Sequence, residues 1–127
     1  MAELILKKKF KENGIKGIKV NSAGIFAKDG EKMSKNSAYA LKRIGINPYN
    51  FRSKLLTAEA AKKADMLICM TEEHKRMLKG FDNAYTLSEI TGTGEVEDPY
   101  GMDKETYVKT CEQIERACDE IVKDILK

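Results

Sequence analysis

The sequence predicts an α/β fold of the doubly wound class, in which helices cover both faces of a parallel sheet. Segments with helical spacing of apolar residues alternate with short apolar runs, as in such folds. The clearest run is Met66-Leu67-Ile68-Cys69-Met70, whose uninterrupted apolar character is typical of a strand covered on both faces. The length of 127 residues fits one domain, residues 1–127. Functional groups in this class lie at the carboxyl ends of the strands.

The first part of the chain predicts two helices with a strand between them. A helix from Met1 to about Asn13 ends at Gly14. Residues 15–20 have apolar side chains at 15, 18 and 20 and predict a short strand that ends near Asn21-Ser22. After a loop, a second helix is expected from about Ser34 to Arg43.

The second part predicts three more helices and two strands. Thr57 is an expected N-cap for a short helix through Ala64, and Thr71 is an expected N-cap for another helix after the strand 66–70. Residues 84–87 form a weaker strand, and 92–103 a polar loop. A long helix is expected at 104–126, with an apolar stripe made by Tyr107, Cys111, Ile114, Cys118, Ile121, Val122 and Ile125.

Charge and hydropathy argue against several classes of partner. The net charge is only +3, and the lysines are interleaved with acids, so we expect no nucleic-acid partner. No apolar run approaches the roughly 18 residues of a membrane helix. The basic cluster Lys7-Lys8-Lys9 follows the short apolar stretch, the reverse of a secretory signal, and we expect a cytoplasmic protein with no membrane partner.

The three cysteines do not form a pattern typical of a disulfide framework or a zinc site. Cys111 and Cys118 are seven residues apart on one expected helix, which separates their Cα atoms by about 10 Å. A disulfide needs less than about 7 Å. Cys69 lies in an apolar strand and is interpreted as a small buried side chain. We expect no metal and no cofactor.

Asp98, in Glu97-Asp98-Pro99-Tyr100-Gly101, is the strongest catalytic candidate. An acid on a loop, followed by a proline of fixed φ, suits a general acid that protonates a leaving oxygen. The alternative is that Asp-Pro only opens a turn. Tyr100 is a candidate wall for a substrate cleft, or else a packing residue. Ser22, at a strand end, is a candidate hydrogen-bonding residue of a substrate site, or else an ordinary polar strand end.

Three segments, in this order, resemble the low-molecular-weight protein tyrosine phosphatases. Val20-Asn21-Ser22-Ala23-Gly24 is similar to a strand ending in Ser-Ala-Gly, and residues 64–71 are similar to an alanine-aspartate strand ending in methionine. Glu97–Gly101 is similar to the general-acid loop. The resemblance implies a flavodoxin-like parallel sheet and a phosphoprotein substrate. It also implies Asp98 as general acid, with Tyr100 and Ser22 in the substrate site.

The family's signature is Cys, five residues, Arg, then Ser or Thr, on the loop after the first, central strand, and its cysteine carries the phosphoryl group. No cysteine here has an arginine six positions later, where Lys75, Ala117 and Asp124 stand instead. The motif is usually followed by Pro-Met-Ala-Glu, and this chain starts Met1-Ala2-Glu3. We therefore expect an N-terminally truncated domain that lacks the central strand and the signature loop, and is inactive.

Three hypotheses remain open. The chain is a phosphatase whose sequence was cut short, a non-catalytic binding or regulatory module, or a small flavodoxin-like binding domain. Residues 23–27 and 70–75 resemble bacterial members, which leaves phosphotyrosine and phosphoarginine as alternative substrates. Without a central strand, Ile18–Asn21 is expected to pair directly with Met66–Met70, or a second copy to form a dimer through the open sheet edge.

Overall fold

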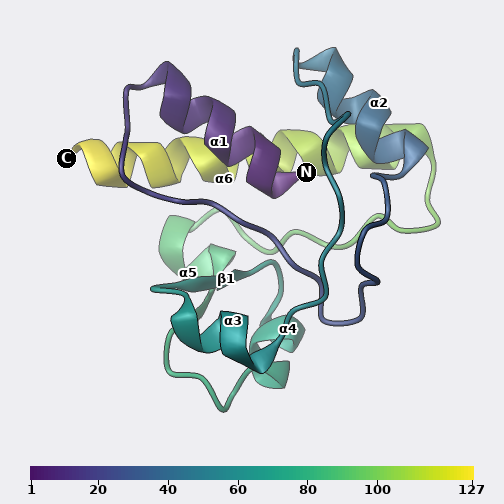
Figure 1. Cartoon of the computed structure of the whole chain (residues 1–127). Helices are drawn as coiled ribbons and strands as arrows, with labels where there is room; N and C mark the ends of the chain where they lie inside the picture. Colours follow the sequence, from purple (N-terminus) through teal and green to yellow (C-terminus); the bar gives the residue numbers. More distant parts are fainter.

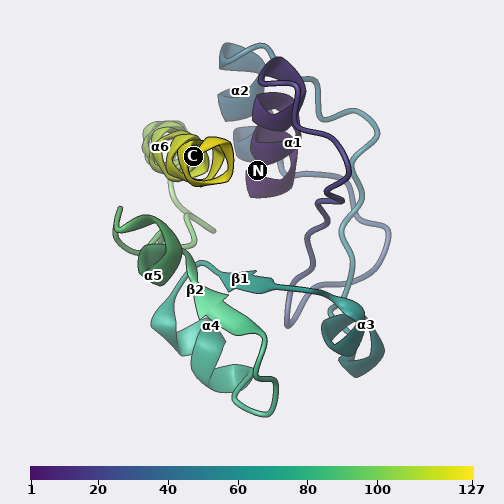
Figure 2. The same cartoon turned by 90° about the vertical axis from the view of Figure 1, so that its left-hand side faces the viewer.

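The computed structural model describes residues 1–127 and arranges them in two layers (Figures 1 and 2). The first layer consists of α1 (Ala2–Glu12), α2 (Lys35–Arg43) and α6 (Lys104–Leu126). The second consists of β1 (Leu67–Cys69), β2 (Ala84–Thr86), α3 (Ala58–Lys63), α4 (Glu72–Met77) and α5 (Leu87–Thr91). No helix is both long and apolar enough to span a membrane.

The sheet has two parallel strands, which confirms the strands expected at 66–70 and 84–87 to within two residues. Leu67 lies opposite Ala84, and the Leu67 N–H donates to the Asn83 carbonyl at 2.9 Å. Because backbone groups alternate between the two edges of a strand, those of Ile68 face away from β2. That second edge of β1 has no strand partner.

The strand expected at 15–20 is absent, and this prediction was wrong. Gly17 has φ +85°, and the stretch from Ile18 to Asn21 forms no backbone hydrogen bond. The expected pairing of Ile18–Asn21 with Met66–Met70 is also absent, because β1 pairs with β2 alone. An alternating pattern predicts a strand only where a neighbour supplies the hydrogen bonds.

The expectation that residues 66–70 are covered on both faces was also wrong in part. Cys69 is buried, but the Met66 side chain is 51% exposed. Leu67 and Ile68 are half-buried. The apolar run therefore predicts the strand correctly but overstates how much of it the helices cover.

The core lies between α6 and the helices α1, α2 and α5 (Figure 2). Ile5 of α1 and Leu41 of α2 are fully buried against the α6 stripe. The stripe follows the predicted spacing from Tyr107 to Val122, while Ile125 is 41% exposed. Each Å² of apolar surface that is buried stabilises the fold by about 25 cal/mol. This contact is therefore the main stabilising interaction of the first layer.

Side-chain caps fix where the helices begin. The side chains of Thr57 and Thr71 accept hydrogen bonds from the Ala60 and His74 N–H groups, which confirms both predicted N-caps. Ser34 and Asp103 cap α2 and α6 in the same way. Each cap satisfies an N–H that has no partner inside the helix.

Candidate functional site

The loop that carries Asp98 follows α5 and is anchored at the carboxyl end of β1. The Val96 N–H donates to the Met70 carbonyl at 3.1 Å, and the Val96 side chain is buried in the core. The neighbouring Glu95 carboxylate accepts from the Glu72 N–H at 2.6 Å, at the first turn of α4. Asp98 follows this anchor by two residues, so it lies at the end of the sheet where α/β folds place their chemistry.

Asp98 itself organises a tight turn. The Tyr100 N–H donates to Asp98 Oδ1 at 3.1 Å, and the Met102 N–H donates to the Pro99 carbonyl at 2.9 Å. Pro99 is buried, whereas Asp98 is exposed. Gly101 takes φ +79°, which other residues adopt only with strain. The Asp98 Oδ2 atom makes no hydrogen bond within the chain and faces solvent, where a ligand oxygen can approach.

Tyr100 extends from the same turn into solvent. Its side chain is 85% exposed, so the reading of Tyr100 as a packing residue was wrong. A tyrosine ring exposed to this degree, two residues from a free carboxylate, is available to pack against a ligand. The turn thus brings Asp98 and Tyr100 together on one short, anchored loop.

Ser22 bonds to a residue that the sequence did not single out. Its N–H and Oγ both donate to Glu3 Oε1, at 2.7 and 2.9 Å, and Lys7 Nζ donates to the other oxygen at 3.0 Å. Burial alone would raise the pKa of Glu3, but the hydrogen bonds from Lys7 and Ser22 outweigh it and hold that pKa below its ordinary value.

The Glu3–Ser22 contact fastens the segment after residue 21 to the first turn of α1. No hydrogen bond joins Ser22 to Asp98 or Tyr100. An acidic residue at this helix start predicts a favourable dipole interaction and an ion pair with Lys7. Nothing local in the sequence points from Glu3 to a serine 19 residues away.

The three cysteines lack the features of a reactive thiol. Cys69, Cys111 and Cys118 are buried and free, and burial raises the pKa of each thiol, that of Cys118 to about 12. The thiolate is the reactive form, and a reactive cysteine needs a lowered pKa. The reading of Cys69 as a small buried side chain is confirmed. No cluster of three or more His, Cys, Asp and Glu residues is arranged to hold a metal ion.

Comparison with known proteins assigns the family. The sequence model described as "Low molecular weight phosphotyrosine protein phosphatase" matches residues 1–127. The chain belongs to that family. The resemblance drawn from the three sequence segments is therefore confirmed at the level of the family, and the α/β phosphatase fold with it.

Two curated relatives and one solved structure illustrate the range within the family. The chain is 32% identical over 136 residues to a protein-arginine-phosphatase of Bacillus subtilis, covering 100% of this chain and 88% of that protein. It is 33% identical over 122 residues to the low molecular weight protein-tyrosine-phosphatase PtpB of Staphylococcus haemolyticus, covering 90% and 81%. A YwlE arginine phosphatase mutant with a phosphorylated active-site serine superposes with a TM-score of 0.91, at 32% identity, over 99% of this chain and 86% of that one.

Proposed function

We propose that residues 1–127 form the body of one phosphatase domain that removes a phosphoryl group from a protein side chain, and that they supply Asp98 as its general acid. The observation that carries the proposal is the free Asp98 carboxylate oxygen on a loop anchored at the carboxyl end of β1. In this reaction a cysteine thiolate attacks phosphorus and forms a phosphocysteine. Asp98 gives its proton to the departing side-chain atom, and water then releases phosphate.

Tyr100 and Ser22 hold the substrate and the surrounding loops in this proposal. The exposed Tyr100 ring forms a wall beside the phosphorylated side chain. The Ser22 hydroxyl donates to Glu3 and keeps its oxygen lone pairs free to accept a hydrogen bond from a loop at the site. Neither Tyr100 nor Ser22 takes part in a chemical step in this proposal.

The nucleophile is not among these 127 residues in our proposal. All three cysteines are buried with raised thiol pKa values, and none is followed by arginine at the sixth position. The chain by itself should therefore show no hydrolysis of a small aryl phosphate. A fusion that places the family's strand and Cys-x5-Arg loop before Met1 should be active. Activity of the 127-residue chain that disappears on mutation of one cysteine would refute the proposal.

The phosphorylated side chain is tyrosine or arginine. The protein-tyrosine-phosphatase relative is 33% identical to the chain and the protein-arginine-phosphatase relative is 32% identical, so sequence identity does not decide between them. The active fusion decides between them when it is given one protein phosphorylated on tyrosine and another phosphorylated on arginine, with phosphate release measured for each. A preference of at least about tenfold assigns the substrate, and failure to release phosphate from either would contradict a phosphoprotein phosphatase.

A second candidate function is a non-catalytic binding or regulatory module. The burial of all three thiols favours it. The DNA upstream of the Met1 codon distinguishes the two: an in-frame strand followed by Cys-x5-Arg supports the enzyme, and a stop codon supports the module.

A further inference from the structure

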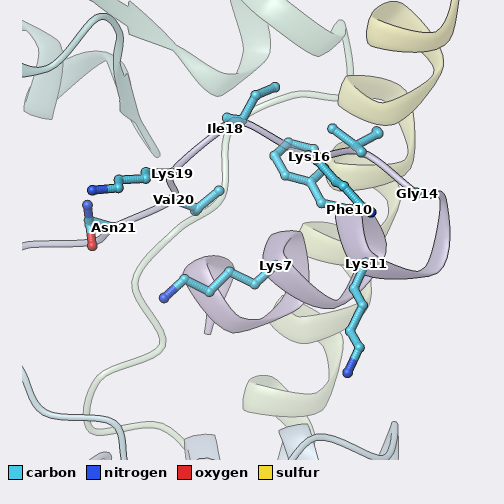
Figure 3. Close-up of a pocket in the computed structure, with 10 residues that line it drawn as sticks. Lys7, Phe10, Lys11, Gly14, Lys16, Ile18, Lys19, Val20 and Asn21 are labelled. Atoms are coloured by element: carbon cyan, nitrogen blue, oxygen red, sulfur yellow. The ribbon is translucent and has the colours of Figure 1, made fainter.

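A groove of about 490 Å³ lies between α1 and residues 14–21 (Figure 3). In the active fusion described above, the added strand precedes Met1 and takes the free edge of Ile18–Asn21. The open groove is therefore a feature of the chain without that strand. The hydrogen bonds that hold the start of the Asp98 loop involve residues 70, 72, 95 and 96, and none of these lines the groove.

Two hydrogen bonds attach the start of the Asp98 loop to the link between β1 and α4. The Val96 N–H donates to the Met70 carbonyl at 3.1 Å, and the Glu72 N–H donates to Glu95 Oε1 at 2.6 Å. One bond alone would leave the loop free to turn about it. Two separate points of attachment also fix the direction in which the chain leaves toward Asp98.

The two attachments differ in what they contribute to the fold. The Val96 side chain is 4% exposed and belongs to the core cluster, so this residue also stabilises the packing of the helices. Glu95 and Glu72 are both exposed. If the Glu95 carboxylate is removed, water takes its place at the Glu72 N–H. The loss therefore falls on the position of the loop and not on the fold.

No other bond holds the main chain between this attachment and Asp98. Neither Glu97 nor Asp98 forms a backbone hydrogen bond through its own N–H or C=O. The two bonds that form the turn beyond Asp98 join residues 98–102 to one another. They shape the turn but do not fix its place relative to β1. On the side where the chain enters the turn, the place of Asp98 depends on Glu95 and Val96.

We propose that Glu95 is a positioning residue for the general acid: its bond to the Glu72 N–H keeps Asp98 within hydrogen-bond reach of the leaving atom. This inference rests on the proposed phosphatase function. A general acid has to lie about 2.6–3.2 Å from the atom that it protonates, and a displacement of about 1 Å costs up to about 100-fold in rate. Glu95 itself transfers no proton and acts only as a hydrogen-bond acceptor.

The test compares two variants at position 95 with a control at the start of α4. Glu95→Ala removes the acceptor, whereas Glu95→Gln keeps a carbonyl oxygen that accepts the bond without the charge. Glu73→Ala is the matched control, because Glu73 is an exposed acid in the same first turn and forms no ion pair. Each variant is made in the active fusion and in the 127-residue chain.

In the fusion, Glu95→Ala should slow single-turnover cleavage of phosphotyrosine about tenfold and that of p-nitrophenyl phosphate within about twofold, because nitrophenol needs less protonation. Glu95→Gln and Glu73→Ala should stay within about twofold of wild type with both substrates. In an Asp98→Asn background, Glu95→Ala should cause no further loss, because the group that it positions is gone. A purely structural role would slow both substrates, with or without Asp98.

Hydrogen exchange in the 127-residue chain tests the same contact without catalysis. Glu95→Ala should speed exchange of the Tyr100 N–H relative to Glu73→Ala, because a loosely held turn opens more often. Equal exchange in these two variants would overturn the role of Glu95. So would a fusion that is active and depends on Asp98 but is unchanged by Glu95→Ala, or slowed equally with both substrates. A fusion that is inactive or indifferent to Asp98→Asn would instead contradict the proposed function, and the inference with it.

Discussion

At the scale of single residues, Glu3 connects the first turn of α1 to Ser22, and its ionisation should appear in the stability of the fold. Its pKa is lowered from the ordinary value of 4.5, so the folded state favours the charged form. This contribution is complete above the unfolded pKa and disappears as pH falls through the folded pKa. Glu3→Gln should lower the free energy of unfolding by about 1–3 kcal/mol at pH 7, as for a hydrogen-bonded charge.

Urea unfolding of wild type and Glu3→Gln between pH 7 and pH 3 measures this contribution. The difference between the two proteins should shrink as pH falls below the ordinary pKa of 4.5 and go on shrinking as pH falls through the lowered pKa of the folded state. A difference that stays constant over this range would show that Glu3 acts through packing and not through its charge.

The three thiols give a second prediction at the residue scale. Cys69, Cys111 and Cys118 are buried with raised pKa values, so a disulfide reagent at pH 8 should not react with the native chain. In denaturant all three should react within the mixing time. Stoichiometric reaction of any one thiol in the native state, faster than global unfolding, would mean that it is accessible and open to a catalytic role.

At the scale of elements, the sequence predicted helices better than strands. The caps Thr57 and Thr71 and the stripe of α6 depend on local spacing, and all three are found. The expected strand at 15–20 failed because a strand depends on a neighbour that spacing cannot supply. Helix α5 was missed although Thr86 and Glu89 form a capping box, a signal that the sequence displays as Thr-x-x-Glu.

In the candidate site, too, the sequence predicted the features that depend on local residues and not those that depend on distant contacts. The exposed position of the Asp98 turn follows from its Asp-Pro-Tyr-Gly sequence, since proline and glycine set the backbone locally. The anchor from Val96 to Met70 and the contact of Ser22 with Glu3 join residues 26 and 19 positions apart. No local pattern encodes such contacts, so the roles of Asp98, Tyr100 and Ser22 remain predictions.

Packing of α2 against α6 provides a prediction for the element scale. Leu41 is fully buried in the core cluster, and Leu41→Ala should lower the free energy of unfolding by about 2–5 kcal/mol because it leaves a cavity. Leu126→Ala is the matched control: its side chain is 58% exposed, and the change should stay within about 0.5 kcal/mol. Urea denaturation measures the free energy of unfolding of both variants. An equal decrease in the two variants would show that Leu41 is not a core residue.

At the scale of the whole molecule, the free edge of β1 predicts self-association. The Ile68 backbone groups face away from β2 and have no strand partner, and unpaired edges are templates for pairing with another chain. We propose that two copies pair through this edge. The unfolding midpoint should then rise with protein concentration, and sedimentation should show dimer. A monomer whose midpoint is the same over a hundredfold range of concentration would contradict this proposal.

We propose that Asp98 protonates the leaving group of a phosphoryl transfer. The most direct measurement is single-turnover cleavage of phosphotyrosine and of p-nitrophenyl phosphate by the active fusion and its Asp98→Asn variant. Tyrosine is a poor leaving group, with a phenol pKa of about 10, so the variant should form the phosphoenzyme roughly 100-fold more slowly. The more acidic nitrophenol needs less protonation and should show a much smaller loss. An unchanged rate with phosphotyrosine would contradict the assignment of Asp98.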